Sequence, residues 1–150
     1  MTLADFKPLA KRSLSSVVDA FDRLGLTPNQ VSLVSFVFAL AGSALFYFAS
    51  DFGAYAYVGA SILVAVSGIL DVVDGELARK IGGGEGTRKG DFLDHTLDRY
   101  SDMSIIIGVA GGVGEWVVGV FALTGTFLTS YMGTQAQAVG AGRDYGGVLG

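Results

Sequence analysis

Residues 71–98 read DVVDGELARKIGGGEGTRKGDFLDHTLD, and they join two long apolar segments of the chain. Two aspartates close the first segment and two open the second: Asp71, Asp74, Asp94 and Asp98. An unpaired carboxylate at membrane depth costs roughly 2.5 to 3.5 kcal/mol or more. Four such groups therefore indicate a functional site at this end of both segments.

The 150-residue chain is rich in apolar residues and poor in charge. Hydrophobic residues make up 51% of it, charged residues make up 16%, and the mean hydropathy is +0.52. This composition excludes an ordinary soluble domain. It indicates an all-α integral membrane helical bundle.

Charged residues are absent from four intervals of the sequence, 24–50, 52–70, 103–114 and 116–142. A spanning helix needs roughly 20 apolar residues, so the third interval is too short by itself. Its helix must begin near residues 92–94, which places Asp94 and Asp98 inside the span. We therefore predict transmembrane helices at 29–49, 54–80, 91–113 and 116–139.

The N-terminal segment has the pattern of an amphipathic helix that lies on the membrane surface. Its charged and apolar residues alternate, unlike the short basic start and apolar core of a signal peptide. We predict a surface helix at residues 3–23 and a break at Pro28 before the first span. The apolar face would consist of Phe6, Leu9, Leu14, Val17, Val18 and Phe21.

Lysine and arginine residues gather at one end of the predicted bundle. They precede the first span, fill the loop between the second and third, and follow the fourth, whereas the loops around Asp51 and Glu115 contain none. The positive-inside rule then predicts a multi-pass protein of the cell membrane with its aspartate end facing the cytoplasm. The chain has no cysteine, which excludes disulfides and thiolate metal sites, and we expect no nucleic-acid partner.

The spacing of the aspartates predicts a metal site. Asp71 and Asp74 are three residues apart and Asp94 and Asp98 are four apart, so each pair lies on one helix face. Four converging carboxylates repel one another, by on the order of 3 kcal/mol per pair at about 6 Å. Two Mg²⁺ or Mn²⁺ ions would offset this repulsion and would form the usual clamp for displacement at phosphorus.

Three residues beside the first pair suit a phosphorylated substrate. Gly75 removes a side chain where a substrate could approach the helix. Arg79 offers a planar set of donors for a phosphate, and Ala78 leaves room on the aspartate face. Each has an ordinary alternative in helix packing or anchoring, and it is their conjunction with four aspartates that favours a site.

Other patterns carry less weight. The glycine-rich residues 82–90 fit neither phosphate-loop motif, so we exclude a P-loop. His95, about 100° round the helix from Asp94, is favoured as a packing or interface residue over a ligand. Gly108–Gly112 matches GxxxG, which predicts close helix packing within the monomer or at a dimer face.

Two alternative functions remain open from the residues alone. A membrane cation carrier or channel would also use intramembrane aspartates. It gives no role to Gly75, Ala78 or Arg79, and it predicts ion flux without phosphoryl transfer. A structural helical subunit predicts that replacing all four aspartates with asparagine is neutral or stabilising.

The order D-x2-D-G-x2-A-R, then G-x3-D-x3-D, resembles the signature of the CDP-alcohol phosphotransferase family. Its eight positions are filled by Asp71, Asp74, Gly75, Ala78, Arg79, Gly90, Asp94 and Asp98. The resemblance implies a six-helix membrane enzyme, commonly a homodimer, that moves a phosphatidyl or archaetidyl group from a CDP-alcohol to a polyol or polyol phosphate. The resemblance also implies that CMP is released and that the reaction belongs to phospholipid biosynthesis. Residues 1–150 would then form a single domain truncated after the fourth transmembrane helix.

The resemblance also implies roles for individual residues. The four aspartates would bind two metal ions, and Asp98 would in addition be the general base toward the acceptor hydroxyl. Contacts to the CDP-lipid would come from the motif residues Gly75, Ala78, Arg79 and Gly90, from the segment Asn29, Gln30, Val31 and Ser32, and from Thr87 and Arg88.

The chain departs from the family pattern at two places. The loop 80–89 is longer than the usual eight residues, and residues 130–137 lack the basic side chains that relatives use for the acceptor phosphate. The second departure weakens inositol phosphate as the acceptor. The phrase FLDHTLDRY at 92–100 is similar to archaeal members, which favours an ether-lipid donor and leaves the acceptor, the lipid type and the metal open.

Overall fold

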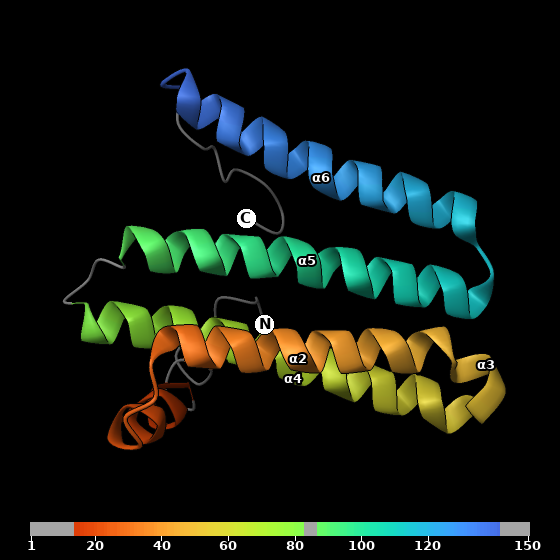
Figure 1. Cartoon of the computed structure of the whole chain (residues 1–150), viewed down its shortest axis with the longest axis horizontal. Coiled ribbons are helices and arrows are strands. Elements are labelled where there is room, and N and C mark those ends of the chain that lie inside the picture. Colours follow the sequence, from red (N-terminus) through yellow and green to blue (C-terminus); the bar gives the residue numbers. More distant parts are fainter. Residues whose placement is uncertain (1–13, 83–86, 142–150) are drawn as a thin grey trace, which may run out of the picture.

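The computed structural model describes residues 14–82 and 87–141, and within them it contains helices and no strands (Figure 1). Residues 14–23 form the described part of the surface helix, and residues 3–13 of its predicted range lie outside the described residues. The remaining helices are α2 (Pro28–Tyr47), α3 (Ala49–Phe52), α4 (Ala54–Ile81), α5 (Arg88–Val113) and α6 (Trp116–Ala138). The four predicted spans are thus confirmed as helices.

Three of the described helices are long and apolar enough to cross a membrane, judged by length and composition. They are α2, α4 and α6. Helix α5 has 26 residues, which is a spanning length, but its first half carries the charges of the aspartate motif. It lies along α2 in the same bundle (Figure 1).

Helix α2 lies at the centre of the bundle, packed against both α4 and α5. The sequence starts α2 with a capping box, in which Gln30 N donates to Thr27 Oγ1 (3.4 Å) and Thr27 N donates to Gln30 Oε1 (2.9 Å). Pro28 occupies the first turn, where its missing N–H costs nothing. Helix α6 packs on α5 and diverges from it toward the C-terminal end (Figure 1).

Small residues set the contact between α2 and α5. A methyl group on Gly108 would overlap the backbone of Ser43, and one on Gly112 would overlap the carbonyl oxygen of Phe46. The GxxxG face therefore packs against α2 within the monomer. Ser43 Oγ also donates a hydrogen bond across this contact, to the carbonyl oxygen of Ser104.

The surface helix docks on the end of the bundle that carries the aspartates. Its Val18 packs with Val31 of α2 and with Val73 and Leu77 of α4 in the buried core cluster. At the rim, the Lys80 ammonium lies 2.8 Å from Asp19 and 2.6 Å from Asp22. The hydrogen bond and charge of Lys80 lower the pKa of the exposed Asp19 carboxyl.

Two boundaries differ from the sequence predictions. The first span ends at Tyr47, and the short helix α3 fills the turn before α4, where Gly53 adopts a φ of 84°. Helix α5 begins at Arg88 instead of 91, because the Thr87 hydroxyl accepts a hydrogen bond from Gly90 N (3.1 Å) and caps the helix.

Candidate metal centre

The structure brings the four motif aspartates to one place between α4 and α5. Carboxylate oxygens of Asp71, Asp74 and Asp94 lie within 4.8 Å of one another. A second group consists of oxygens of Asp94 and Asp98 with a ring nitrogen of His95, again within 4.8 Å. Asp94 belongs to both groups, so the two are contiguous.

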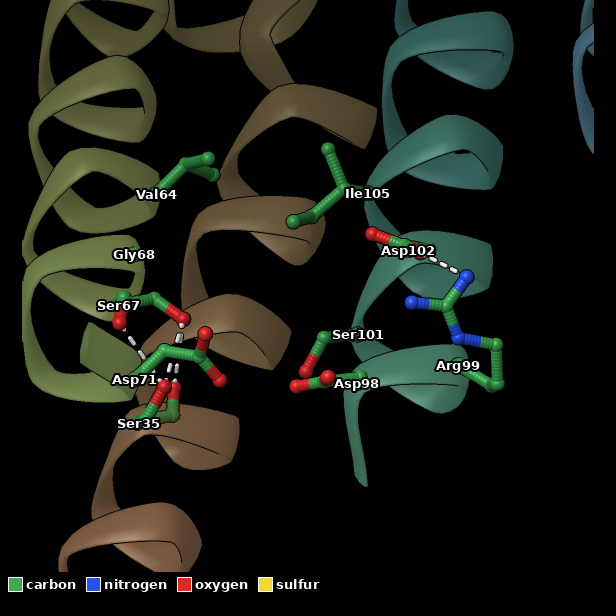
Figure 2. A pocket seen from close by; sticks show the side chains of 10 residues that line it. All are labelled: Ser35, Val64, Ser67, Gly68, Asp71, Asp98, Arg99, Ser101, Asp102 and Ile105. Carbon is green, nitrogen blue, oxygen red and sulfur yellow. Dashed lines mark hydrogen bonds and ion pairs between the residues drawn. The ribbon is translucent and has the colours of Figure 1, made fainter. Parts of the chain in front are cut away.

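Helical geometry explains this convergence. Positions three or four residues apart share one face of a helix, and the end of α4 at Ile81 lies near the start of α5 at Arg88 in the sequence, so the two faces can meet. Figure 2 shows Asp71 and Asp98 pointing toward one another across the space between α4 and α5.

Asp74 is the most buried of the four, with 2% of its surface exposed. Its Oδ2 atom has no hydrogen-bond partner among the described residues. A buried carboxylate oxygen without a partner is costly unless a cation or a donor satisfies it. Carboxylate oxygens in this number are the donors that Mg²⁺ and Mn²⁺ prefer, so these residues fit the predicted metal ions.

A cavity of about 240 Å³ adjoins the aspartates on the side toward the middle of α4 and α5 (Figure 2). Hydroxyl and carboxylate groups dominate its wall, together with two aliphatic side chains. The lining residues are Ser35, Val64, Ser67, Gly68, Asp71, Asp98, Arg99, Ser101, Asp102 and Ile105.

A pair of buried serines closes one wall of this cavity. Ser35 Oγ donates to the carbonyl oxygen of Ser67, and Ser67 Oγ donates to that of Ser35, both at 2.9 Å. These reciprocal bonds tie α2 to α4 one turn before Asp71 and so help to fix that carboxylate.

Arg99 is a site residue that the sequence reasoning missed. Its Nη1 donates to Ser130 Oγ of α6 (2.6 Å) and lies 3.0 Å from Asp102. The guanidinium therefore joins α5 to α6 beside Asp98. One signal could have found it: a charged pair three residues apart within a predicted span needs internal partners.

The four residues at the start of α2 that were predicted to contact the CDP-lipid have different surroundings in the structure. Asn29 lies near the motif glycine, because a Cβ on Gly90 would be 3.6 Å from Asn29 Oδ1. Ser32 is buried, and its hydroxyl donates to Pro28 O (3.1 Å). The Gln30 side chain is used in the capping box, and Val31, 2% exposed, packs in the core.

The other predicted substrate residues lie at the open end of the cluster, the end away from the cavity, in the last turns of α4 and at the start of α5. Gly75 leaves space there, since only Arg79 Nη2, at 3.9 Å, would approach an added Cβ. Arg79 pairs with Glu76 at 2.9 Å, and 61% of its side chain is exposed. Ala78 is partly buried, Arg88 is exposed, and Thr87 is held next to Gly90 by its capping bond.

Known proteins are similar to this chain in sequence. Residues 25–147 match the profile of a family described as CDP-alcohol phosphatidyltransferase. An archaetidylinositol phosphate synthase of Pyrococcus horikoshii is 36% identical over 141 residues, which cover 93% of this chain and 71% of the relative. The protein of the same description from Methanothermobacter thermautotrophicus is 34% identical, covering 92% and 66%.

Solved structures of phosphatidylinositol phosphate synthase (PgsA1) from Mycobacterium tuberculosis share the fold. The complex with manganese and citrate superposes with a TM-score of 0.73 at 26% identity, covering 90% of this chain and 65% of that one. The form with CDP-DAG bound gives a TM-score of 0.71 at 27% identity, covering 91% and 69%. The chain thus spans about two thirds of the length of these proteins.

Proposed function

The chain belongs to the CDP-alcohol phosphatidyltransferase family, and we propose that it is a metal-dependent membrane enzyme that transfers a phospholipid group from a CDP-linked lipid to an acceptor hydroxyl. CMP is the second product. The single observation that carries the proposal is the meeting of the four aspartates, with the buried Asp74 oxygen unpartnered among the described residues.

We propose that Asp71, Asp74, Asp94 and Asp98 hold two divalent ions at the mouth of the cavity. The ions would polarise the phosphoryl group and offset the charge of the leaving CMP. The manganese complex of the mycobacterial structure supports a divalent cation in this fold. Mg²⁺ and Mn²⁺ both suit an all-oxygen site.

The proposed reaction is a displacement at phosphorus. The acceptor oxygen bonds to the phosphorus on the lipid side of the pyrophosphate, and the bond from that phosphorus to the bridging oxygen breaks. Asp98 takes the proton of the attacking hydroxyl, a role supported by its place in both the cluster and the cavity wall. Proximity of base and acceptor supplies much of the rate.

The donor is proposed to be held at the open end of the cluster. Gly75, Ala78, Arg79, Thr87, Arg88 and Gly90 lie there, with Asn29 and Ser32 on the facing end of α2. Arg79 would exchange its pairing with Glu76 for a phosphate of the nucleotide, because phosphate is the better partner for its planar donors. Gln30 and Val31 would act through their backbone.

The acceptor is proposed to be a polyol phosphate. The names of the archaeal and mycobacterial relatives point to inositol phosphate. The sequence argued against it, since α6 offers no basic side chain at residues 130–137. Arg99 on the cavity wall supplies a cation from α5 instead.

An assay with a panel of acceptors tests the proposal. The purified protein in lipid nanodiscs would be given labelled CDP-archaeol or CDP-diacylglycerol with inositol phosphate, glycerol phosphate, inositol or serine, and CMP would be followed. We expect CMP to form with one class of acceptor. Cation flux into lipid vesicles that carry the same protein, with no cytidine product, would instead support the carrier alternative.

Two further parts of the proposal concern the whole assembly. We propose that the aspartate end faces the cytoplasm, on the support of the basic residues at that end. A homodimer stays a prediction, and the GxxxG face cannot form its interface because it is used against α2.

A further inference from the structure

Exposed aromatic side chains gather at the end of the bundle opposite the aspartates. At this end α3 turns the chain from α2 to α4, and the connection between α5 and α6 lies on the same side of the molecule (Figure 1). Phe52 is 71% exposed and Tyr55 is 90% exposed, although both are large rings. We call the whole group the aromatic collar, and it consists of Tyr47, Phe48, Phe52, Tyr55 and Trp116.

Packing within the chain holds part of the collar in place. The Tyr47 ring lies edge-on to Trp116, with ring centroids 6.5 Å apart, and to Phe48, with centroids 5.0 Å apart. Gly111 of α5 makes room for the Tyr47 ring, because a methyl group at this glycine would overlap it. The collar therefore joins α2, α5 and α6, and its rings are still about half exposed on the outside.

The residue types of the collar suit a boundary between an apolar medium and water. Tyrosine and tryptophan have an apolar ring with a polar group at one edge, and they are enriched where membranes meet water. Two exposed acids adjoin the collar in the sequence: Asp51 directly precedes Phe52, and Glu115 directly precedes Trp116. Charged side chains belong on the water side of such a boundary, so the collar lies where the apolar spans end.

The length of α4 places the collar one membrane away from the basic end of the bundle. Tyr55 lies in the first turn of α4, and Arg79 lies in the last turn. At about 1.5 Å per residue, roughly 36 Å separate the two positions along the helix. This length falls between the hydrocarbon core, about 30 Å, and the whole bilayer, about 40 to 45 Å.

We infer that the aromatic collar binds the headgroup region of the lipid bilayer at the membrane face opposite the aspartates, and that it sets the depth of the bundle in the membrane. The occupant of this surface is lipid, with the polar edges of Tyr55 and Trp116 at the headgroups and the rings against the upper acyl chains. The inference goes beyond the proposed reaction and does not depend on it.

The depth of Trp116 in the bilayer tests the inference directly. The chain has one tryptophan, so its fluorescence reports on the collar alone. The protein would be reconstituted into vesicles of phosphatidylcholine that is brominated either near the headgroup or near the end of the acyl chain. We expect bromine near the headgroup to quench Trp116 roughly twofold more strongly, because the collar lies at the interface.

A tryptophan moved along the same helix provides a matched control. Phe127 is exposed and lies about three turns after Trp116, on the same face of α6. The double variant Trp116→Phe with Phe127→Trp places the fluorophore roughly 16 Å deeper, near the middle of the hydrocarbon core. Bromine near the end of the acyl chain should quench this variant more strongly.

A second pair of variants tests whether the collar sets the depth. Phe52→Ala with Tyr55→Ala removes the two most exposed rings of the collar, and the quenching of Trp116 by the two lipids should become nearly equal. Ile62→Ala with Ile69→Ala removes two exposed apolar side chains from further along α4. This control should keep the wild-type preference for bromine near the headgroup.

Three results would overturn the inference. Stronger quenching of Trp116 by bromine near the chain end would place the collar inside the hydrocarbon core. Absence of quenching by either lipid would mean that protein covers the collar, as in a contact between two copies of the chain. An unchanged preference after Phe52→Ala with Tyr55→Ala would show that the collar does not set the depth.

Discussion

Asp98 faces two features of the site at once. Its carboxylate belongs to the metal-ligand group with Asp94 and His95, and it also lines the cavity. A group in this position can contact a bound ion and an acceptor hydroxyl together. No other aspartate of the motif except Asp71 lines that cavity.

Asp98→Asn should lower the rate of CMP formation roughly 100-fold or more, since general bases contribute about that factor and a ligand is also altered. The protein should still fold, because asparagine keeps the size of the side chain. Asp91→Asn is the control: Asp91 is exposed in the first turn of α5, outside both ligand groups. An unchanged rate in Asp98→Asn would remove the residue from the mechanism.

Sequence reasoning located the aspartates because their meeting depends on local spacing along two consecutive helices. It missed the Arg99 contact with Ser130, because that contact depends on how α6 lies against α5. It also assigned Gln30 and Val31 to a substrate, while the structure uses their side chains in a cap and in the core. Where a side chain could contact either a substrate or another part of the protein, tertiary packing determines which contact forms.

The contact between α2 and α5 depends on glycines that allow the two backbones to approach. Gly108 and Gly112 present their bare faces to Ser43 and Phe46. A correct α2–α5 contact in turn positions the aspartates of α5 against those of α4, since α2 packs against both helices.

Gly108→Ala should destabilise the bundle by roughly 1 to 3 kcal/mol, because the added methyl group forces the helices apart. Unfolding of the purified protein in mixed micelles would measure this. Gly125→Ala in α6 is a matched control, since a Cβ there meets nothing within 4 Å. It should be neutral, or stabilising by up to about 1 kcal/mol through helix propensity. Equal effects from both substitutions would contradict the packing account.

Helix ranges followed closely from the apolar intervals, and their ends followed less well. The interval 24–50 gives no sign that the helix stops at Tyr47, because the uncharged sequence continues past Tyr47 into the start of the short α3. The early start of α5 depends on one hydroxyl, that of Thr87. Ends set by single caps are less visible in a sequence than long apolar runs.

The docked surface helix joins the N-terminal region to the functional end of the bundle. Val18 packs into the same cluster as Val73 and Leu77, which flank Asp74 in the sequence of α4. Lys80, at the end of α4, holds the rim through Asp19 and Asp22.

Lys80→Ala should loosen this docking only modestly, because ion pairs between solvent-exposed side chains contribute little to stability. Hydrogen exchange of residues 14–23 should become a few-fold faster at low salt. The difference should vanish near 1 M salt, where charges are screened within about 3 Å. Lys89→Ala should leave the exchange unchanged, and a salt-independent effect of Lys80→Ala would contradict an ionic contact.

Strong acid should weaken the same contact between the surface helix and Lys80. Lys80 lowers the pKa of Asp19 in the folded protein below its ordinary value of 3.8. The ion pair therefore stabilises the docked surface helix above pH 3.8, and this stabilisation is lost as the pH falls through the lowered pKa of Asp19. Exchange of residues 14–23 in wild type should approach that of Lys80→Ala only in strong acid. A convergence near neutral pH would contradict the pairing.

The molecule as a whole gathers four carboxylates at one end of a helical bundle, next to a cavity lined largely by serine and aspartate side chains. This arrangement is expensive in a membrane unless cations occupy it. Metal dependence is therefore the property on which the proposed chemistry rests.

The decisive measurement is CMP formation by the purified protein, given a CDP-linked lipid and its acceptor, before and after removal of divalent metal with a chelator. Our account predicts that CMP formation stops on chelation and returns when Mn²⁺ or Mg²⁺ is added back. CMP formation that continues unchanged in the metal-free protein would contradict it.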